Sequence, residues 1–408
     1  MKNRKEDLAK IYINILILFV IWSFVFTMTK TSWADFIYIF LILIAIISIF
    51  VILEYRPRVI SARLLLWFPF VILSILENLR LNNFEGSIYF SACLIMLLIA
   101  RQVDFEDVIS NKIFILSGGL AILGMIFQIV LPGIYNTYVA TFFKNTNDIL
   151  YWANGYGYTG FTYQLGVTAI ILVYFEGIIL YRWKNNENMK NMLVLVTIMF
   201  IFLTGKRTMA LLAILLPALI IVLSNKFNSK KLYNTLCILL MLGILAYFFV
   251  MNSDLFINSK ILGRFANTII DLEKGQDVSS NRSLLYKEAF SMFRNNKLFG
   301  IGLGNFKEKS FFATDVHNVY IQVLCEQGIV GEILFIIPLF VNLIFSIKMN
   351  RYNQKGSLKL SLFLQLFFII YGLTGNVMMN EICYVIYFFS IGIMEKSNKK
   401  NRAGVKES

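Results

Sequence analysis

The sequence predicts an all-α, polytopic membrane protein with about 12 transmembrane helices, and two observations carry that prediction. Of the 408 residues, 58% are hydrophobic and only 15% are charged, which is too apolar for a water-soluble domain of this length. The apolar residues also come in runs of roughly 18 to 25, the length of a helix that crosses the hydrocarbon core of a bilayer. We therefore interpret residues 1–408 as a single membrane-embedded domain.

Two outer segments are long: residues 132–159, and one large extracytoplasmic loop at 252–317 that should contain short interfacial helices. In chain order, the spans cover residues 11–29, 34–53, 59–77, 86–100, 113–131, 160–181, 190–205, 207–224, 232–251, 318–347, 358–377 and 379–395. The tenth span is long, so we expect it to tilt or to project beyond the bilayer.

The distribution of basic residues predicts the orientation. The net charge is +14, and Lys and Arg accumulate in the cytoplasmic loops of membrane proteins. With both termini in the cytoplasm, 24 of the 38 basic residues are cytoplasmic, and nine of the other 14 lie in the large loop 252–317. The N-terminal MKNRKEDLAK precedes an apolar run too long for a cleavable signal, so it is interpreted as the cytoplasmic start of the first helix. Nucleic acid is excluded as a partner because no basic soluble face is expected.

The four cysteines are interpreted as packing residues. Cys93, Cys237, Cys325 and Cys383 all lie inside apolar runs, without a CxxC pair or the spacing of a metal site. We therefore expect neither a disulfide nor a bound metal.

An aromatic and polar segment precedes the sixth span. It runs from Pro132 to Thr159 and contains NTNDILYWANGYGYT, which is rich in Asn, Tyr and Gly. Aromatic faces stack on sugar rings, and Asn side chains both donate and accept hydrogen bonds. The same composition is typical of an interfacial aromatic belt with glycine turns, so both interpretations stay open.

Within the large loop, residues 281–294 show the periodicity of an amphipathic helix. Its apolar positions are Leu285, Tyr286, Ala289, Phe290 and Phe293. Such a helix would lie in the membrane interface, with its basic residues toward water or headgroups. Arg282 differs from the other basic residues because a cation at a helix start opposes the helix dipole, so an anionic partner would explain its position.

The decapeptide KLFGIGLGNF follows, with Gly300, Gly302 and Gly304 in alternation. A dinucleotide-binding loop needs its glycines between a strand and a helix on the cytoplasmic side, and neither condition is expected here. Alternating glycines also let a backbone turn sharply or approach another surface closely, which suits a loop that re-enters the membrane. Further on, Gly328 and Gly331 would let two helices approach closely.

His317, the single histidine of the chain, directly precedes the tenth span together with Asn318. Histidine can accept a proton near neutral pH, and an ordinary interfacial side chain is the alternative. Glu326 and Glu332 lie further along the same apolar run. A carboxylate there indicates either a functional group or a structural polar contact between helices.

A second candidate site lies between the seventh and eighth spans, in LTGKRTMAL. Lys206 and Arg207 lie there at the outer end of a tight helical hairpin, against the positive-inside trend. An anionic ligand such as pyrophosphate would explain them, because arginine grips phosphate oxygens with two parallel hydrogen bonds. Snorkelling to lipid phosphate is the alternative.

The run from Arg282 to Gly331 resembles the signature of the O-antigen ligase and polymerase family. That signature has an arginine-led helix, then P-L-F-G-x-G-x-G-N-F, then H-N-x-Y-L-x-x-x-x-E-x-G-x-x-G. The match is complete here except that Lys297 replaces the proline and Ile321 replaces a leucine. LTGKRTMAL is similar to the family's S-x-S-R-G-A-L element, with Arg207 at the arginine.

The resemblance implies a Wzy-type polysaccharide polymerase of the cytoplasmic (inner) membrane, with its active site on the outer face. Such a membrane glycosyltransferase takes O-antigen or capsular glycan from undecaprenyl pyrophosphate and joins it to a hydroxyl of another lipid-linked repeat unit. The alternatives are an O-antigen ligase that uses lipid A core or another acceptor, a flippase of lipid-linked sugars, and the peptidoglycan polymerase family, whose motifs fit less well. No cofactor and no metal are implied. The expected partners are the lipid-linked oligosaccharide, membrane lipids and a chain-length regulator protein.

The resemblance also implies roles for individual residues. Arg207 and Arg282 would stabilise the charge that grows on the leaving pyrophosphate, and His317 would act on the attacking hydroxyl as a base or positioning group. The residues expected to bind substrate are Lys206, Asn318, Tyr320, Glu326, Gly302 and Gly304.

Overall fold

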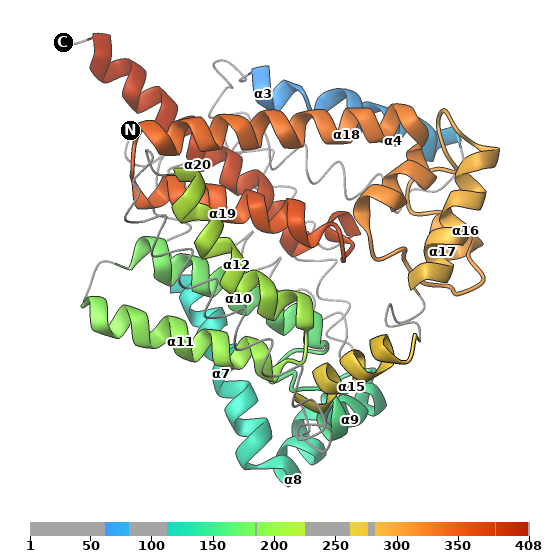
Figure 1. Ribbon diagram of the computed structural model, residues 1–408, viewed down its shortest axis with the longest axis vertical. Helices are drawn as coiled ribbons and strands as arrows, with labels where there is room; N and C mark the ends of the chain where they lie inside the picture. The colour runs from blue at the N-terminus through green and yellow to red at the C-terminus, as the bar shows by residue number, and fades with distance from the viewer. Residues whose placement is uncertain are drawn as a thin grey trace. The chain divides into compact units, whose positions relative to one another are not determined.

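The computed structural model describes residues 62–80, 112–183, 186–224, 262–275, 282–379 and 381–406. These residues form helices joined by turns and loops, and no β-strand occurs among them (Figure 1). Four of their helices are long and apolar enough to cross a membrane. The all-helical architecture expected from the sequence is therefore confirmed in this part of the chain.

The chain divides into two compact units, which are described separately. The first unit contains the described residues within 62–80 and 282–406, and the second unit contains those within 112–275. Outside the described residues lie four expected spans and two cysteines: 11–29, 34–53, 86–100, 232–251, Cys93 and Cys237. The number of spanning helices therefore stays a prediction.

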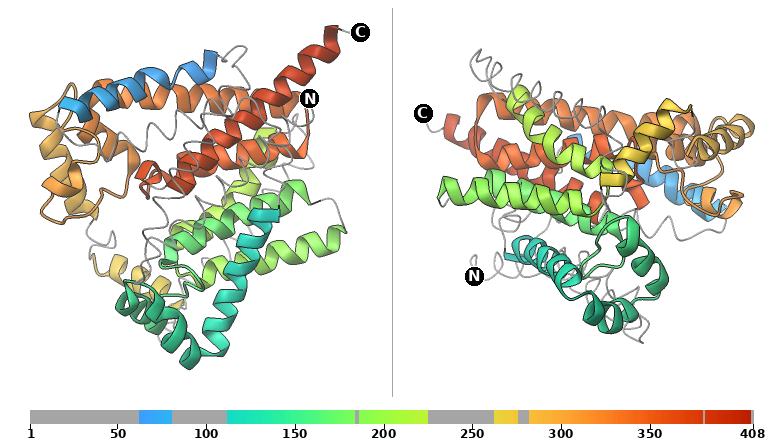
Figure 2. Two further views of the ribbon diagram at one scale, coloured as in Figure 1. Left: turned by 180° about the vertical axis from the view of Figure 1, so that it is seen from behind. Right: turned by 60° about the horizontal axis from the view of Figure 1, so that its bottom comes forward.

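Helix α10 (Leu165–Arg182) is the centre of the second unit. Three apolar helices are associated with it: α7 (Lys112–Val130), α11 (Glu187–Leu203) and α12 (Arg207–Ser224) (Figures 1 and 2). Every residue of α10 from Val167 to Ile179 is buried, as expected for a helix whose apolar residues lie on all sides, and the buried stretch includes Thr168 and Glu176. A shorter helix, α15 (Leu262–Glu273), belongs to the same unit.

The fifth, seventh and eighth expected spans agree with α7, α11 and α12 within a few residues. The sixth, predicted to begin at residue 160, begins later as α10 because the preceding residues form a bonded turn. The N–H groups of Thr159 and Gly160 both donate to Oε1 of Gln128 at 2.9 Å. This buried side chain thus satisfies the backbone that the helix leaves unpaired.

The first unit is built from α3 (Ala62–Leu65), α4 (Phe68–Arg80), α18 (Val319–Tyr352), α19 (Gly356–Tyr371) and α20 (Glu381–Lys406). Helix α18 contacts all four of the others (Figure 1). Trp67, in the turn between α3 and α4, packs edge-on against Phe335 and Tyr387 with ring centres 5.9 and 5.8 Å apart. Edge-to-face aromatic contacts of this kind fix the helices in one register.

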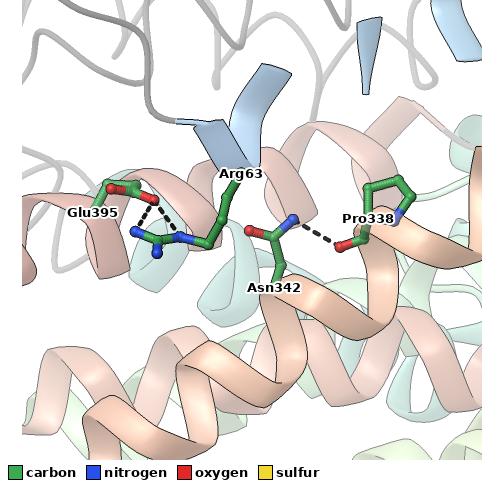
Figure 3. Close-up of polar contacts among 4 residues, drawn as sticks. All are labelled: Arg63, Pro338, Asn342 and Glu395. Atoms are coloured by element: carbon green, nitrogen blue, oxygen red, sulfur yellow. Dashed lines mark hydrogen bonds and ion pairs between the residues drawn. The ribbon is translucent and has the colours of Figure 1, made fainter. Parts of the chain in front are cut away.

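An ion pair joins α3 to α20 across most of the chain length. Nε and Nη2 of Arg63 donate to one oxygen of Glu395 at 2.8 and 2.6 Å (Figure 3). The guanidinium carbon lies 3.4 Å from the ring centre of Phe345 on α18. On the same helix, Nδ2 of Asn342 donates to the carbonyl oxygen of Pro338 at 2.8 Å (Figure 3). The guanidinium of Arg63 thus joins α3 to α20 through Glu395 and to α18 through Phe345.

Helix α18 is broken at Gly328, whose φ of 65° and ψ of −169° are not helical. The break leaves a short helix at 319–327 and a longer one at 329–352, which at 1.5 Å per residue spans about 36 Å. The tenth expected span is therefore two helices rather than one continuous long helix. Gly328 and Gly331 were expected to permit close packing between helices, and in the structure both lie at this break.

Candidate functional site

A broken helix exposes unpaired backbone groups at both of its inner ends. Here a loop at 297–304, which we call the glycine loop, supplies partners at the end of the first part. The N–H groups of Ile301 and Gly302 donate to the carbonyl oxygens of Cys325 and Glu326, at 3.2 and 2.7 Å. A Cβ on Gly300 would lie 2.3 Å from the carbonyl carbon of Glu326, so the loop approaches more closely than a side chain would allow.

The same loop also satisfies the start of the second part of α18. The N–H groups of Ile329 and Val330 donate to the carbonyl oxygens of Lys297 and Leu298, at 2.9 and 3.2 Å. A Cβ on Gly328 would lie only 2.2 Å from the carbonyl oxygen of Leu298. The glycine loop therefore replaces the helical hydrogen bonds that the break removes, and the two features depend on each other.

Gly328→Ala is expected to destabilise the docked glycine loop by about 3 kcal/mol or more, because it adds backbone strain to a steric clash. Gly275→Ala is the matched control: Gly275 also has positive φ, 67°, but open space where a Cβ would stand. It should cost only about 1 kcal/mol. Thermal unfolding of the purified variants in detergent measures both. Equal losses of stability in the two variants would mean that the clash with Leu298 does not contribute to the destabilisation.

The carboxylate of Glu326 holds the end of the glycine loop. Its carboxylate is fully buried and accepts hydrogen bonds from the N–H groups of Gly304 at 2.9 Å and Phe306 at 3.1 Å. Nε2 of Gln322 donates to the same carboxylate at 3.1 Å. The backbone N–H of Gly302 thus donates to the main-chain carbonyl of Glu326, and the N–H of Gly304 donates to its carboxylate. The substrate-binding roles of Gly302, Gly304 and Glu326 stay predictions.

His317 has a left-handed backbone, with φ of 59°. Residues other than glycine pay roughly 1–2 kcal/mol for this conformation, which is concentrated at functional sites. Asn318 then caps α18: its Oδ1 accepts from the N–H groups of Tyr320 and Ile321, at 3.1 and 3.2 Å. The imidazole of His317 is half-buried directly before this helix start.

Side chains at the start of α18 form hydrogen bonds with the backbone at the end of α19. The Asn318 amide donates to the carbonyl oxygen of Leu373 at 3.1 Å, and the hydroxyl of Tyr320 donates to that of Ile369 at 2.8 Å. Both side chains thus position the backbone around His317, and whether they also bind substrate stays a prediction.

Helix α16 (Arg282–Asn295) agrees within one residue with the predicted amphipathic helix. Leu285 and Ala289 are buried in a core with residues of the glycine loop and of the segment before His317. Phe290, another of the predicted apolar positions, is exposed. Arg282 is the first residue of α16 and is half-buried. Arg282, His317 and the glycine loop thus belong to one folded structure in the first unit.

Two polar residues in this structure were not identified from the sequence. Oε1 of Gln322 accepts from the amide of Asn376 and from the N–H of Val316, besides the bond that its Nε2 gives to Glu326. Glu288 on α16 accepts from the hydroxyl of Ser310 at 2.7 Å and so holds the loop that leads to His317. The available signal was a Gln one turn before Glu326 in an otherwise apolar run.

Lys206 and Arg207 lie in the second unit, at the turn between α11 and α12, as the sequence predicted. Arg207 is the first residue of α12, and its Nη1 donates to the hydroxyl of Thr268 on α15. Gly205 has a φ of 66°, and a Cβ there would lie 1.8 Å from the carbonyl oxygen of Tyr156. This turn is therefore packed directly against the aromatic segment that precedes α10.

The part of the chain that the structure describes contains no group of three or more His, Cys, Asp or Glu that could hold a metal. Cys325 and Cys383 are both buried, which agrees with their interpretation as packing residues.

Residues 192–336 match a family model described as O-Antigen ligase. The matched range begins within α11, includes Lys206 and Arg207, and ends beyond the break in α18. It therefore supports the family that the sequence motifs resemble. A search of curated proteins gave no match.

Proposed function

We propose that this chain, in which residues 192–336 belong to the O-antigen ligase family, is a polysaccharide polymerase. It would transfer glycan from undecaprenyl pyrophosphate to a hydroxyl of another lipid-linked repeat unit, at the outer face of the cytoplasmic membrane. The proposed topology has both termini in the cytoplasm. A chain-length regulator is proposed as its protein partner, and no metal is proposed in the reaction.

The reaction breaks the bond between the sugar C1 and the pyrophosphate oxygen and forms a bond from C1 to the acceptor oxygen. Negative charge grows on the pyrophosphate, and the acceptor hydroxyl loses its proton. Cationic side chains stabilise the first change, and we assign that role to Arg207 and Arg282. A nearby base or positioning group assists the second, and we assign that role to His317.

The observation that carries the proposal is the conformation of the segment at His317. The chain holds its single histidine in left-handed backbone, with Asn318, Tyr320 and Glu326 fixing the elements on either side. A strained, rigidly supported histidine is what an active site requires, whereas an incidental interfacial side chain has no need of strain. Arg282 begins α16, whose buried residues Leu285 and Ala289 share a core with Val316, the residue before His317.

Glycan gel analysis of a deletion strain tests the function. The expected result is a loss of long chains, with single repeats still present on lipid or on the final acceptor. Long chains that accumulate on undecaprenyl pyrophosphate would identify a ligase instead. Repeats trapped at the cytoplasmic face would identify a flippase, and the assigned site would then be wrong.

A further inference from the structure

The aromatic segment before α10 is a folded element of the second unit. A π-helical turn at Tyr135–Val139 and α9 (Thr146–Gly155) enclose a small core of Tyr135, Ala140, Phe143 and Ile149. The buried hydroxyl of Tyr135 donates to the carbonyl oxygen of Gly160 at 2.6 Å. Burial also raises the pKa of Tyr135 to about 12. The segment is therefore a stable platform.

One face of this platform carries an ordered pair of aromatic rings. Tyr151 on α9 is 59% exposed, and its ring centre lies 4.9 Å from that of Tyr156. The two hydroxyl oxygens are 2.6 Å apart and hydrogen-bonded. Trp152, the next residue of α9, instead packs against the small core. The pair is thus held in place from within the segment.

The surroundings of the Tyr151 ring are polar and open. Helix neighbours lie three and four positions away, and here they are Asn147, Asp148, Asn154 and Gly155, all exposed. Asn and Asp side chains supply hydrogen-bond donors and acceptors around the ring. Gly155 adds no side chain, and a Cβ there would meet nothing within 4 Å beyond its chain neighbours, so the helix surface at Gly155 is open.

The pair is also fixed to the turn that carries Lys206 and Arg207. Tyr158 N–H donates to the carbonyl oxygen of Leu203 at 3.0 Å. A Cβ on Gly157 would lie 2.4 Å from the carbonyl oxygen of Thr204, and a Cβ on Gly205 would lie 1.8 Å from the carbonyl oxygen of Tyr156. Backbone contacts within the second unit therefore hold Tyr156 next to the turn that carries the two cations.

We propose that Tyr151 and Tyr156 form a carbohydrate subsite, which binds a pyranose ring of the glycan whose pyrophosphate Lys206 and Arg207 bind. This rests on the proposed function. The axial C–H bonds of a pyranose ring carry partial positive charge and pack against the negative face of an aromatic ring. Asn147 and Asn154 flank that face with groups that suit sugar hydroxyls.

A lipid-facing aromatic belt is the competing explanation, and the geometry favours sugar. Rings of such a belt point their hydroxyls individually toward headgroups. Here the hydroxyls of Tyr151 and Tyr156 instead bond to each other.

The test measures sugar binding to the purified full-length chain in detergent by saturation-transfer NMR. The probe is the lipid-free repeat-unit oligosaccharide released by mild acid from the host's own lipid-linked pool. Tyr151→Ala should weaken binding roughly tenfold, the loss of one good aromatic contact. Gly155→Leu should have a similar effect, because it fills the open space without removing an aromatic ring.

Two matched controls lie on the same segment. Tyr138 is 74% exposed and Gly133 also has open space at its Cβ position, so Tyr138→Ala and Gly133→Leu make the same chemical changes elsewhere. Both should bind the oligosaccharide as the wild type does. Equal weakening in variants and controls, unchanged binding in Tyr151→Ala and Gly155→Leu, or no binding by the wild type would each overturn the subsite.

Failure of the proposed function would look different. If Arg207→Ala and His317→Ala both still made full-length polymer while sugar binding depended on Tyr151, the catalytic assignment would fall and the subsite would stand. If polymer vanished in those two variants while Tyr151→Ala bound sugar normally, the catalytic assignment would stand and the subsite would fall.

Discussion

Polymer synthesis is expected to fall by roughly 10²–10³ when Arg207 or Arg282 is replaced by alanine, the usual effect of removing one group that stabilises transition-state charge. Each guanidinium is proposed to act on the leaving pyrophosphate, where charge develops as the C1–O bond breaks. The variants should remain in the membrane at wild-type levels. The measurement is the glycan gel pattern, together with membrane abundance by immunoblot.

Arg207→Lys and Arg282→Lys should recover part of the activity, because lysine keeps the charge but not the two parallel hydrogen bonds. Two controls remove a basic residue outside the proposed site. Arg294 is exposed at the far end of α16, and Lys190 pairs with Glu187 near the far end of α11. Arg294→Ala and Lys190→Ala should leave chain length unchanged. Wild-type chains from Arg207→Ala or Arg282→Ala would remove that residue from the catalytic site.

His317→Ala is expected to reduce polymer synthesis by about 10²–10⁴, the usual contribution of a general acid or base. This substitution alone does not identify the cause of a loss, because it also replaces a residue whose backbone is left-handed, with φ of 59°. A loss of activity could then come from a displaced α18 rather than from a missing proton acceptor.

His317→Asn and His317→Gly separate these two causes. Asparagine and glycine both adopt left-handed backbone readily, and neither can accept a proton near neutral pH. If His317 acts chemically, both variants should be as inactive as alanine while their thermal unfolding matches the wild type. Recovery of activity in either one would show that the histidine serves only to turn the chain, and the base would lie elsewhere.

Local features of this protein could be predicted from its sequence because they depend on residues close together in the chain. Hydrophobic runs gave α7, α11 and α12 within a few residues, and helical periodicity gave α16 within one. The turn with Lys206 and Arg207 was predicted for the same reason. The expected start of α10 was wrong by five residues, because Gln128, about 30 residues earlier, holds the preceding backbone in a turn.

The features that only tertiary structure decided are those made by hydrogen bonds between distant residues. The break at Gly328 is stable because carbonyl and N–H groups of the glycine loop, more than 20 residues earlier, replace the lost helical bonds. Glu326 is interpretable as a clamp only once Gly304 and Phe306 are seen to donate to it.

The sequence by itself thus predicted most of the helical segments that the structure describes, and it named candidate residues for glycan transfer whose roles stay predictions, since composition and spacing record hydrophobicity and chemistry directly. It could not determine that the polar signature folds as a loop docked into a broken helix, or that Tyr151 and Tyr156 are fixed to the Lys206 and Arg207 turn. Those arrangements follow from where unpaired backbone groups find partners, and that depends on the folded chain.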